Sequence, residues 1–112
     1  PDRRGVEPGY EEKSFDAAAR RGRLRLIASP DGRDGSVTIH QDACVYAGLL
    51  DGDEGAEHAI APGRRAYVHL ARGELEVNGT RLAAGDALKL TRESAVRLAH
   101  GREAEVLLFD LP

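Results

Sequence analysis

Short stretches in which apolar and polar residues alternate run through most of the chain, separated by clusters of Gly, Asp and Pro. In Arg23–Ser29, Leu24 and Leu26 alternate with arginines, as expected of half-buried strands. The denser apolar run Cys44–Leu50 predicts a central strand. The whole pattern predicts about nine or ten short strands between residue 23 and the C-terminus.

Turn residues support an antiparallel arrangement of these strands. Asn78 and Gly79 separate two alternating stretches, and both residue types tolerate the positive φ that a two-residue hairpin requires. The chain has 13 glycines and no long amphipathic stretch of helical period. The sequence therefore predicts an antiparallel β-sandwich or barrel.

The N-terminal part has a different composition. Pro1–Lys13 is polar, rich in turn formers and without apolar periodicity, which is typical of a linker. Ser14–Arg21 is expected to hold one helical turn with Asp16 as its N-cap. With 112 residues in total, we expect an interdomain linker or arm over 1–22 and one domain over 23–112.

Composition excludes several classes of function. The net charge of -3 gives no global attraction to nucleic acid or to anionic membranes, and no apolar run is long enough to span a bilayer. Arg20, Arg21, Arg23 and Arg25 form a local basic cluster, but aromatic residues are few, so we interpret it as a strand edge or domain contact. Cys44 is the only cysteine, which favours a cytoplasmic location.

Five stretches follow one another along the chain: PGYEEKSF at 8–15, RGRLRLIASPDGRDGSVTIHQDA at 21–43, APGRRAYVHLARGELEVNG at 61–79, LAAGDALKL at 82–90 and AEVLLFDLP at 104–112. Together they are similar to the C-terminal half of pirin-like proteins, in which two cupin domains follow one another. The resemblance implies an all-β fold, an antiparallel cupin barrel (a double-stranded β-helix or jelly roll). It also implies that the chain, which starts at Pro1 and contains no Met, is a fragment of a longer protein.

Cupin motifs hold a metal through His-x-His, a Glu and a later His, and each position can be placed here by its spacing from Gly73 and Gly85. The first two fall on Ala59 and Ala61 or, one residue later, on Ile60 and Pro62; the third falls on Ala66 and the fourth on Val96. Transition metals need imidazole, carboxylate or thiolate ligands, which none of these side chains supplies. We therefore expect no metal and no other cofactor in this chain. The resemblance implies Fe(II) or a similar divalent metal in the missing N-terminal domain.

Other candidate binding residues remain open from the sequence. His58 becomes a metal ligand only if the motif slides by one residue; otherwise it is a surface histidine at the start of a strand. Tyr67 and His69 share one strand face and Val68 and Leu70 the other, so either pair can point inward. If Tyr67 and His69 point inward, they form a small-molecule site at the barrel mouth. No catalytic residue is assigned.

The remaining reactive side chains have simpler explanations. We interpret Cys44 as a small buried hydrophobe, His40 as a residue that closes a turn, and His100 as a solvated residue of a hairpin tip. Arg64 and Arg65 follow Ala-Pro-Gly, where they either clamp an anion or mark the barrel rim.

These observations predict a metal-free C-terminal cupin domain, structural or accessory to a metal-bearing N-terminal cupin with quercetin 2,3-dioxygenase-like activity in the full-length protein. This chain alone is then not an enzyme, and the N-terminal cupin is its partner. As an isolated fragment, we expect it to form a weak homodimer. The alternatives are a small-molecule-binding or catalytic cupin that uses His58, Tyr67 and His69, and a protein–protein interaction module.

Overall fold

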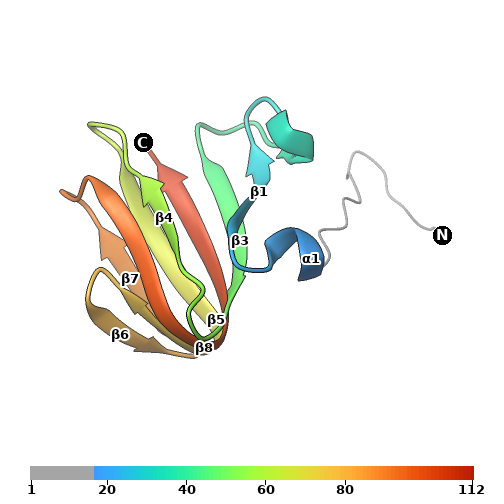
Figure 1. The fold of residues 1–112 in the computed structure, drawn as a ribbon. Coiled ribbons are helices and arrows are strands. Elements are labelled where there is room, and N and C mark those ends of the chain that lie inside the picture. The colour runs from blue at the N-terminus through green and yellow to red at the C-terminus, as the bar shows by residue number, and fades with distance from the viewer. Residues whose placement is uncertain (1–16) are drawn as a thin grey trace.

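The computed structural model describes residues 17–112, whose regular secondary structure is almost entirely β-strand (Figure 1). One short helix, α1, and one 3-10 turn, η1, precede β2, and the rest of the elements are strands. Their bounds are α1 (Ala17–Arg20), β1 (Leu24–Ser29), η1 (Arg33–Gly35), β2 (Val37–Thr38), β3 (Cys44–Leu50), β4 (Ala56–Ala59), β5 (Arg65–Val77), β6 (Thr80–Ala83), β7 (Ala87–Leu90) and β8 (Ala95–Leu111). The prediction of an all-β fold is confirmed.

The strands form one sheet that folds over on itself into two layers (Figure 1). The first layer has the order β2-β1-β3-β8-β5-β7 and uses residues 104–111 of β8 and 65–70 of β5. The second layer has the order β4-β8-β5-β6 and uses residues 95–98 of β8 and 74–77 of β5. Because β5 and β8 bend from one layer into the other, the layers are joined at one end; we call the opposite end, where β3 begins and β8 finishes, the open end.

The expectation of nine or ten short strands was wrong, because eight strands are observed in the described residues. The sequence pattern splits β5 at Gly73 and β8 at Gly101, but both strands continue through these glycines. Gly73 has a φ of 74° and Gly101 passes close to the backbone of Leu50, so both serve the bends and not the ends of strands. One pair, β1–β2, is parallel, whereas the other strand pairs are antiparallel.

The core lies between the two layers and is aliphatic. Its fully buried members include Leu70 and Val68 on β5 and Val106 and Leu108 on β8. These residues alternate with exposed or half-buried neighbours, as the period of two requires. Replacing one such leucine with alanine would cost about 2–5 kcal/mol of stability.

The predicted hairpin between β5 and β6 is confirmed. Val77 pairs with Thr80, and the two residues between them, Asn78 and Gly79, have φ values of 48° and 84°. The Asn78 side chain also binds the backbone at two positions of β8, so the turn fixes the second layer as well as the hairpin.

Residues 17–22 pack against the first layer. The predicted helical turn is present as α1, whereas its expected N-cap Asp16, like the rest of residues 1–16, lies outside the described residues. The backbone N–H of Gly22 donates to the carbonyl of Leu49 at 2.8 Å, and Arg20 forms an ion pair of 3.2 Å with Glu105. Over residues 17–112, helices of the length and hydrophobicity needed to cross a membrane are absent.

Candidate functional site

A polar cluster occupies the interior at the open end. Asp110 continues the inward-facing series Ala104, Val106 and Leu108 of β8, so its carboxylate points between the layers and is only 9% exposed. His58 reaches it from β4 in the opposite layer, with 2.7 Å between His58 Nε2 and Asp110 Oδ2. These two residues thus connect the layers across the interior.

Arg64, in the turn before β5, holds the second oxygen of this carboxylate. Its Nε donates to Asp110 Oδ1 at 2.6 Å, and its Nη1 donates to both carboxylate oxygens of Asp42 at 3.1 Å. The hydrogen bond that Arg64 donates to Asp110, and after it the one donated to Asp42, raises the pKa of the Arg64 guanidinium. The sequence alternatives for Arg64 were an anion clamp or a rim residue; both carboxylates that it contacts belong to the chain itself.

Two further polar residues extend the cluster along β3. The ring of Tyr46 lies 4.7 Å from that of His58, and burial raises the pKa of the Tyr46 phenol. Cys44 is directly paired with Asp110 across β3 and β8, and its Sγ lies 3.3 Å from Nη2 of Arg33. The interpretation of Cys44 as a buried hydrophobe was therefore wrong, because this thiol is half-buried and contacts a guanidinium.

The register of β4 shows which residues occupy the interior at the expected metal-ligand positions. His58 pairs with Val96, and Ile60, Ala66 and Val96 are buried. Ala59, Ala61 and Pro62 are exposed, so the inward-facing pair is His58 and Ile60. It lies one residue earlier than the first predicted placement, whereas the second placement included the buried Ile60. These side chains do not fit a metal, because the single imidazole among them is bonded to Asp110 and the others are aliphatic. Within residues 17–112, His, Cys, Asp and Glu side chains do not gather in threes at any place that could hold a metal ion.

The structure separates the three residues considered as ligand-binding candidates. His58 lies inside, whereas Tyr67 and His69 lie on the outer face of β5, because Val68 and Leu70 on the same strand are fully buried. Tyr67 is 37% exposed and stacks obliquely on Phe109, at 6.0 Å between ring centroids. Tyr67 and His69 thus do not form a pair at the barrel mouth, and they do not share a site with His58.

His40 and His100 do not belong to the open-end cluster. Both are exposed; His40 makes no hydrogen bond through its side chain to the described residues, so it does not close a turn in that way. His100 lies in the bend of β8 and not at a hairpin tip, with a φ of 54°. Neither residue brings a second imidazole near His58.

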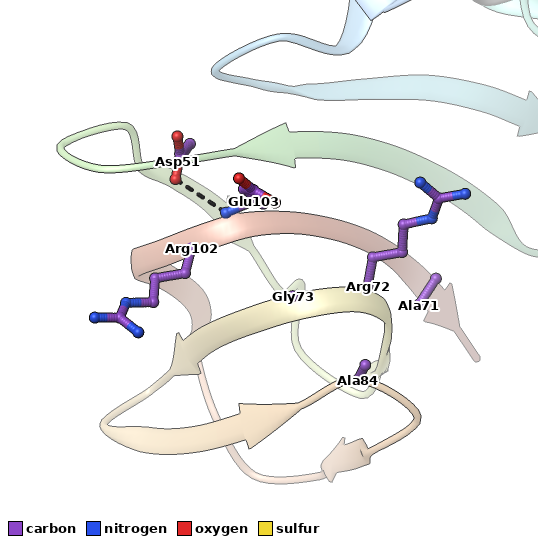
Figure 2. Close-up of a pocket in the computed structure, with 7 residues that line it drawn as sticks. All are labelled: Asp51, Ala71, Arg72, Gly73, Ala84, Arg102 and Glu103. Carbon is purple, nitrogen blue, oxygen red and sulfur yellow. Dashed lines mark hydrogen bonds between the residues drawn. The ribbon is translucent and has the colours of Figure 1, made fainter.

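A pocket of about 730 Å³ lies at the joined end, where β5 and β8 bend (Figure 2). Its lining residues are Asp51, Ala71, Arg72, Gly73, Ala84, Arg102 and Glu103. Its carboxylates and guanidinium groups are equal in number, and Asp51 accepts a hydrogen bond from the backbone N–H of Glu103 at 2.9 Å. Figure 2 shows the side chains of Arg72 and Arg102 directed away from each other. Hence the pocket has no excess of one charge and no pair of arginines that converge on a single ligand.

The central residue of the open-end cluster, Asp110, was not predicted from the sequence. Asp110 lies within an apolar stretch, at the same phase as Val106 and Leu108, so the alternation alone placed a carboxylate in the core. This signal was available. Its partners His58 and Arg64 were not identifiable in the same way, because they lie 52 and 46 residues away in the chain.

Comparisons with known proteins agree with this fold. Residues 26–111 match the family described as the quercetinase C-terminal cupin domain. A quercetin 2,3-dioxygenase of Escherichia coli K12 is 38% identical over all of this chain, which covers 47% of that protein. A putative quercetin 2,3-dioxygenase of Pseudomonas aeruginosa is 40% identical over 99% of this chain and 48% of that protein. The chain thus spans about half the length of the curated relatives it matches.

Solved structures show the same relationship. The crystal structure of YhhW from Escherichia coli superposes with a TM-score of 0.85 at 38% identity, covering 100% of this chain and 47% of that one. A structure of the bacterial pirin YhhW with nickel(II) gives a TM-score of 0.76 at 39% identity, over 80% of this chain and 39% of that one. The predicted resemblance is confirmed: the chain belongs to the pirin-like proteins, as a quercetinase C-terminal cupin domain.

Proposed function

We propose that this chain is the metal-free, accessory half of a two-domain cupin protein. Its partner is an N-terminal cupin that holds a divalent metal such as Fe(II) and carries a quercetin 2,3-dioxygenase-like activity. The relatives' names and their length, about twice that of this chain, support this assignment. The nickel(II) complex of the bacterial pirin is consistent with a metal in the full-length protein. A free thiol at Cys44 suits the cytoplasm.

The observation that carries the proposal is the set of side chains at the inward-facing ligand positions. Ile60, Ala66 and Val96 have no lone pair to offer, and His58 is bonded to Asp110. A cupin metal centre needs roughly three or four protein ligands that converge on the ion. A single engaged imidazole cannot replace such a set, so chemistry in the full-length protein must reside in the other half.

Metal analysis tests this proposal. After dialysis against a chelator, this chain should retain no stoichiometric transition metal. Its melting temperature should not change on addition of Fe(II), Ni(II) or Zn(II). The full-length protein should retain about one equivalent and degrade quercetin, whereas this chain alone should not.

The His58→Ala variant is the matched control for residual binding. It should bind as little metal as the parent chain. One equivalent of metal retained by the parent and lost by the variant would overturn the proposal and support a catalytic role for this barrel.

A further inference from the structure

Arg64, Asp110 and His58 form a continuous chain of contacts across the interior at the open end. Arg64 binds one oxygen of the Asp110 carboxylate at 2.6 Å, and His58 binds the other at 2.7 Å. We propose that these three residues form an ionic lock that joins the two layers and closes the open end, at the place where the cupin motifs position a metal. The inference rests on the proposed function only in treating this half as metal-free.

The position of the lock within the sheet carries this inference. His58 is the direct cross-strand partner of Val96, and Asp110 is the direct cross-strand partner of Ala66. Val96 and Ala66 occupy two of the metal-ligand positions. Side chains of directly opposed residues stand about 4.5–5.5 Å apart at Cβ. His58 therefore lies beside the expected ligand position Val96 on the neighbouring strand, and Asp110 lies beside the expected ligand position Ala66. The contact between His58 and Asp110 crosses the space between the two layers.

Burial makes the three residues dependent on one another. The side chains of His58 and Asp110 are 14% and 12% exposed, and that of Arg64 is 24% exposed. A carboxylate removed from water to this extent is tolerated when it is paired and hydrogen-bonded. Removing Arg64 would leave Asp110 with the imidazole alone, and removing Asp110 would leave His58 without a carboxylate between the layers.

Arg64 also links two turns at the open end. Arg64 extends from Asp110 to Asp42, with 3.1 Å between its Nη1 and the Asp42 carboxylate, so it ties the turn before β5 to the turn before β3. Behind it, Ala66 and Val96 are fully buried.

Hydrogen–deuterium exchange on this chain tests the lock. In Arg64→Gln and Asp110→Asn, amides of residues 56–64 and 104–111 should exchange faster than in the parent. The unfolding equilibrium constant should rise by roughly 100- to 1000-fold, as when one partner of a buried pair is removed. The double variant should lose much less than the product of the single effects, because both substitutions break the same contact.

Matched controls make the outcome decisive. Arg97 pairs with Glu57 across the same two strands at 3.7 Å, but both side chains are more than half exposed, so Arg97→Gln should change little. Arg64→Lys keeps the positive charge but loses the several N–H donors of the guanidinium. Its unfolding equilibrium constant should lie between those of the parent and Arg64→Gln, and it is measurable even if Arg64→Gln fails to fold. Effects of Arg64→Lys and Asp110→Asn no larger than that of Arg97→Gln, or fully multiplicative effects in the double variant, would overturn the lock. Metal retained by the parent chain would instead overturn the proposed function and leave these exchange results unchanged.

Discussion

His58 and Val96 are directly opposed across the β4–β8 pair and both face the interior at the open end. An imidazole thus stands beside the isopropyl group of Val96, one of the metal-ligand positions expected from the motif spacing. The imidazole is hydrogen-bonded to a carboxylate instead, with 2.7 Å between His58 Nε2 and Asp110 Oδ2. The interior at the open end is therefore organised around a hydrogen-bonded imidazole and carboxylate with aliphatic neighbours.

This pairing predicts where a histidine can restore metal affinity. In Val96→His, two imidazoles would stand side by side on the inward face, and Ni(II) should bind roughly tenfold more tightly than to the parent, about 1.4 kcal/mol. Isothermal titration calorimetry measures the difference. Ala59→His is the control, since it adds a histidine next to His58 in sequence but on the exposed face. Equal affinities for the two variants would contradict the inward placement of His58.

The bend of β5 depends on a glycine that has no room for a side chain. Gly73 has a φ of 74°, and a Cβ there would overlap the carbonyl oxygens of Arg102 and Glu103. Gly73→Ala should therefore destabilise the chain by at least about 3 kcal/mol in urea unfolding. Gly79 also has a positive φ but open space around it, so Gly79→Ala should cost only about 1–2 kcal/mol. A Gly73→Ala cost no greater than that of Gly79→Ala would show that the bend relaxes.

The sequence was informative where structure depends on neighbouring residues. The turn at Asn78 and Gly79 was predicted because its backbone requirement is local. The continuity of β5 through Gly73 was not predicted, because a glycine in a bend and a glycine in a turn have the same local signature. The orientation of Tyr67 could not be decided either, since alternation defines two faces without saying which one the opposite layer covers.

The open-end cluster could not be predicted because its members are far apart in the sequence. His58 could be selected as unusual, but its role depends on Asp110, which is 52 residues away and joins it only when β8 folds back into the first layer. The first motif placement counted from Gly73 missed the inward-facing residues His58 and Ile60 by one residue, and the second included only Ile60. The length of the turn between β4 and β5 changes the spacing from Gly73 to the residues of β4, so spacing alone does not define their position. The pairing of His58 with Val96 defines the register of β4.

Glu74 offers a direct test of the electrostatics of the second layer. Its hydrogen bond from Arg81, at 2.8 Å, lowers the pKa of the carboxyl below 4.5. A lowered folded-state pKa contributes stability that is present above the unfolded value and is lost as pH falls through the folded value. Carboxyl NMR titration should give a pKa below 4.5 in the parent and a return towards 4.5 in Arg81→Gln. An unchanged pKa in that variant would show that Arg81 is not the cause.

The outer face of the first layer carries an apolar row. Val45, Phe109 and Tyr67 are consecutive cross-strand partners, and the Tyr67 ring is 37% exposed. Because exposed apolar rows tend to associate, we expect weak dimerisation of this chain as concentration rises, and Tyr67→Glu should reduce it. Sedimentation velocity over a concentration series measures both. A parent chain that stays monomeric throughout would contradict this expectation.

The last prediction concerns Asn78, which joins the β5–β6 hairpin to β8. Its Oδ1 accepts a hydrogen bond from the backbone N–H of Arg97 at 2.6 Å, and its Nδ2 donates to the carbonyl of Ala95 at 3.0 Å. Asn78→Gly keeps the backbone freedom that a φ of 48° requires but removes both bonds, so it should cost about 1–3 kcal/mol.

Two companion variants separate the causes. Asn78→Ala should cost about 1–2 kcal/mol more than Asn78→Gly, because a methyl group is disfavoured at positive φ. Asn78→Asp keeps the acceptor for Arg97 but loses the donor, and it places a carboxylate beside the Ala95 carbonyl. Urea unfolding should therefore find Asn78→Asp less stable than the parent at neutral pH. Equal stability of the parent and Asn78→Gly would mean that the turn is held by its backbone alone and that the side chain does not connect it to β8.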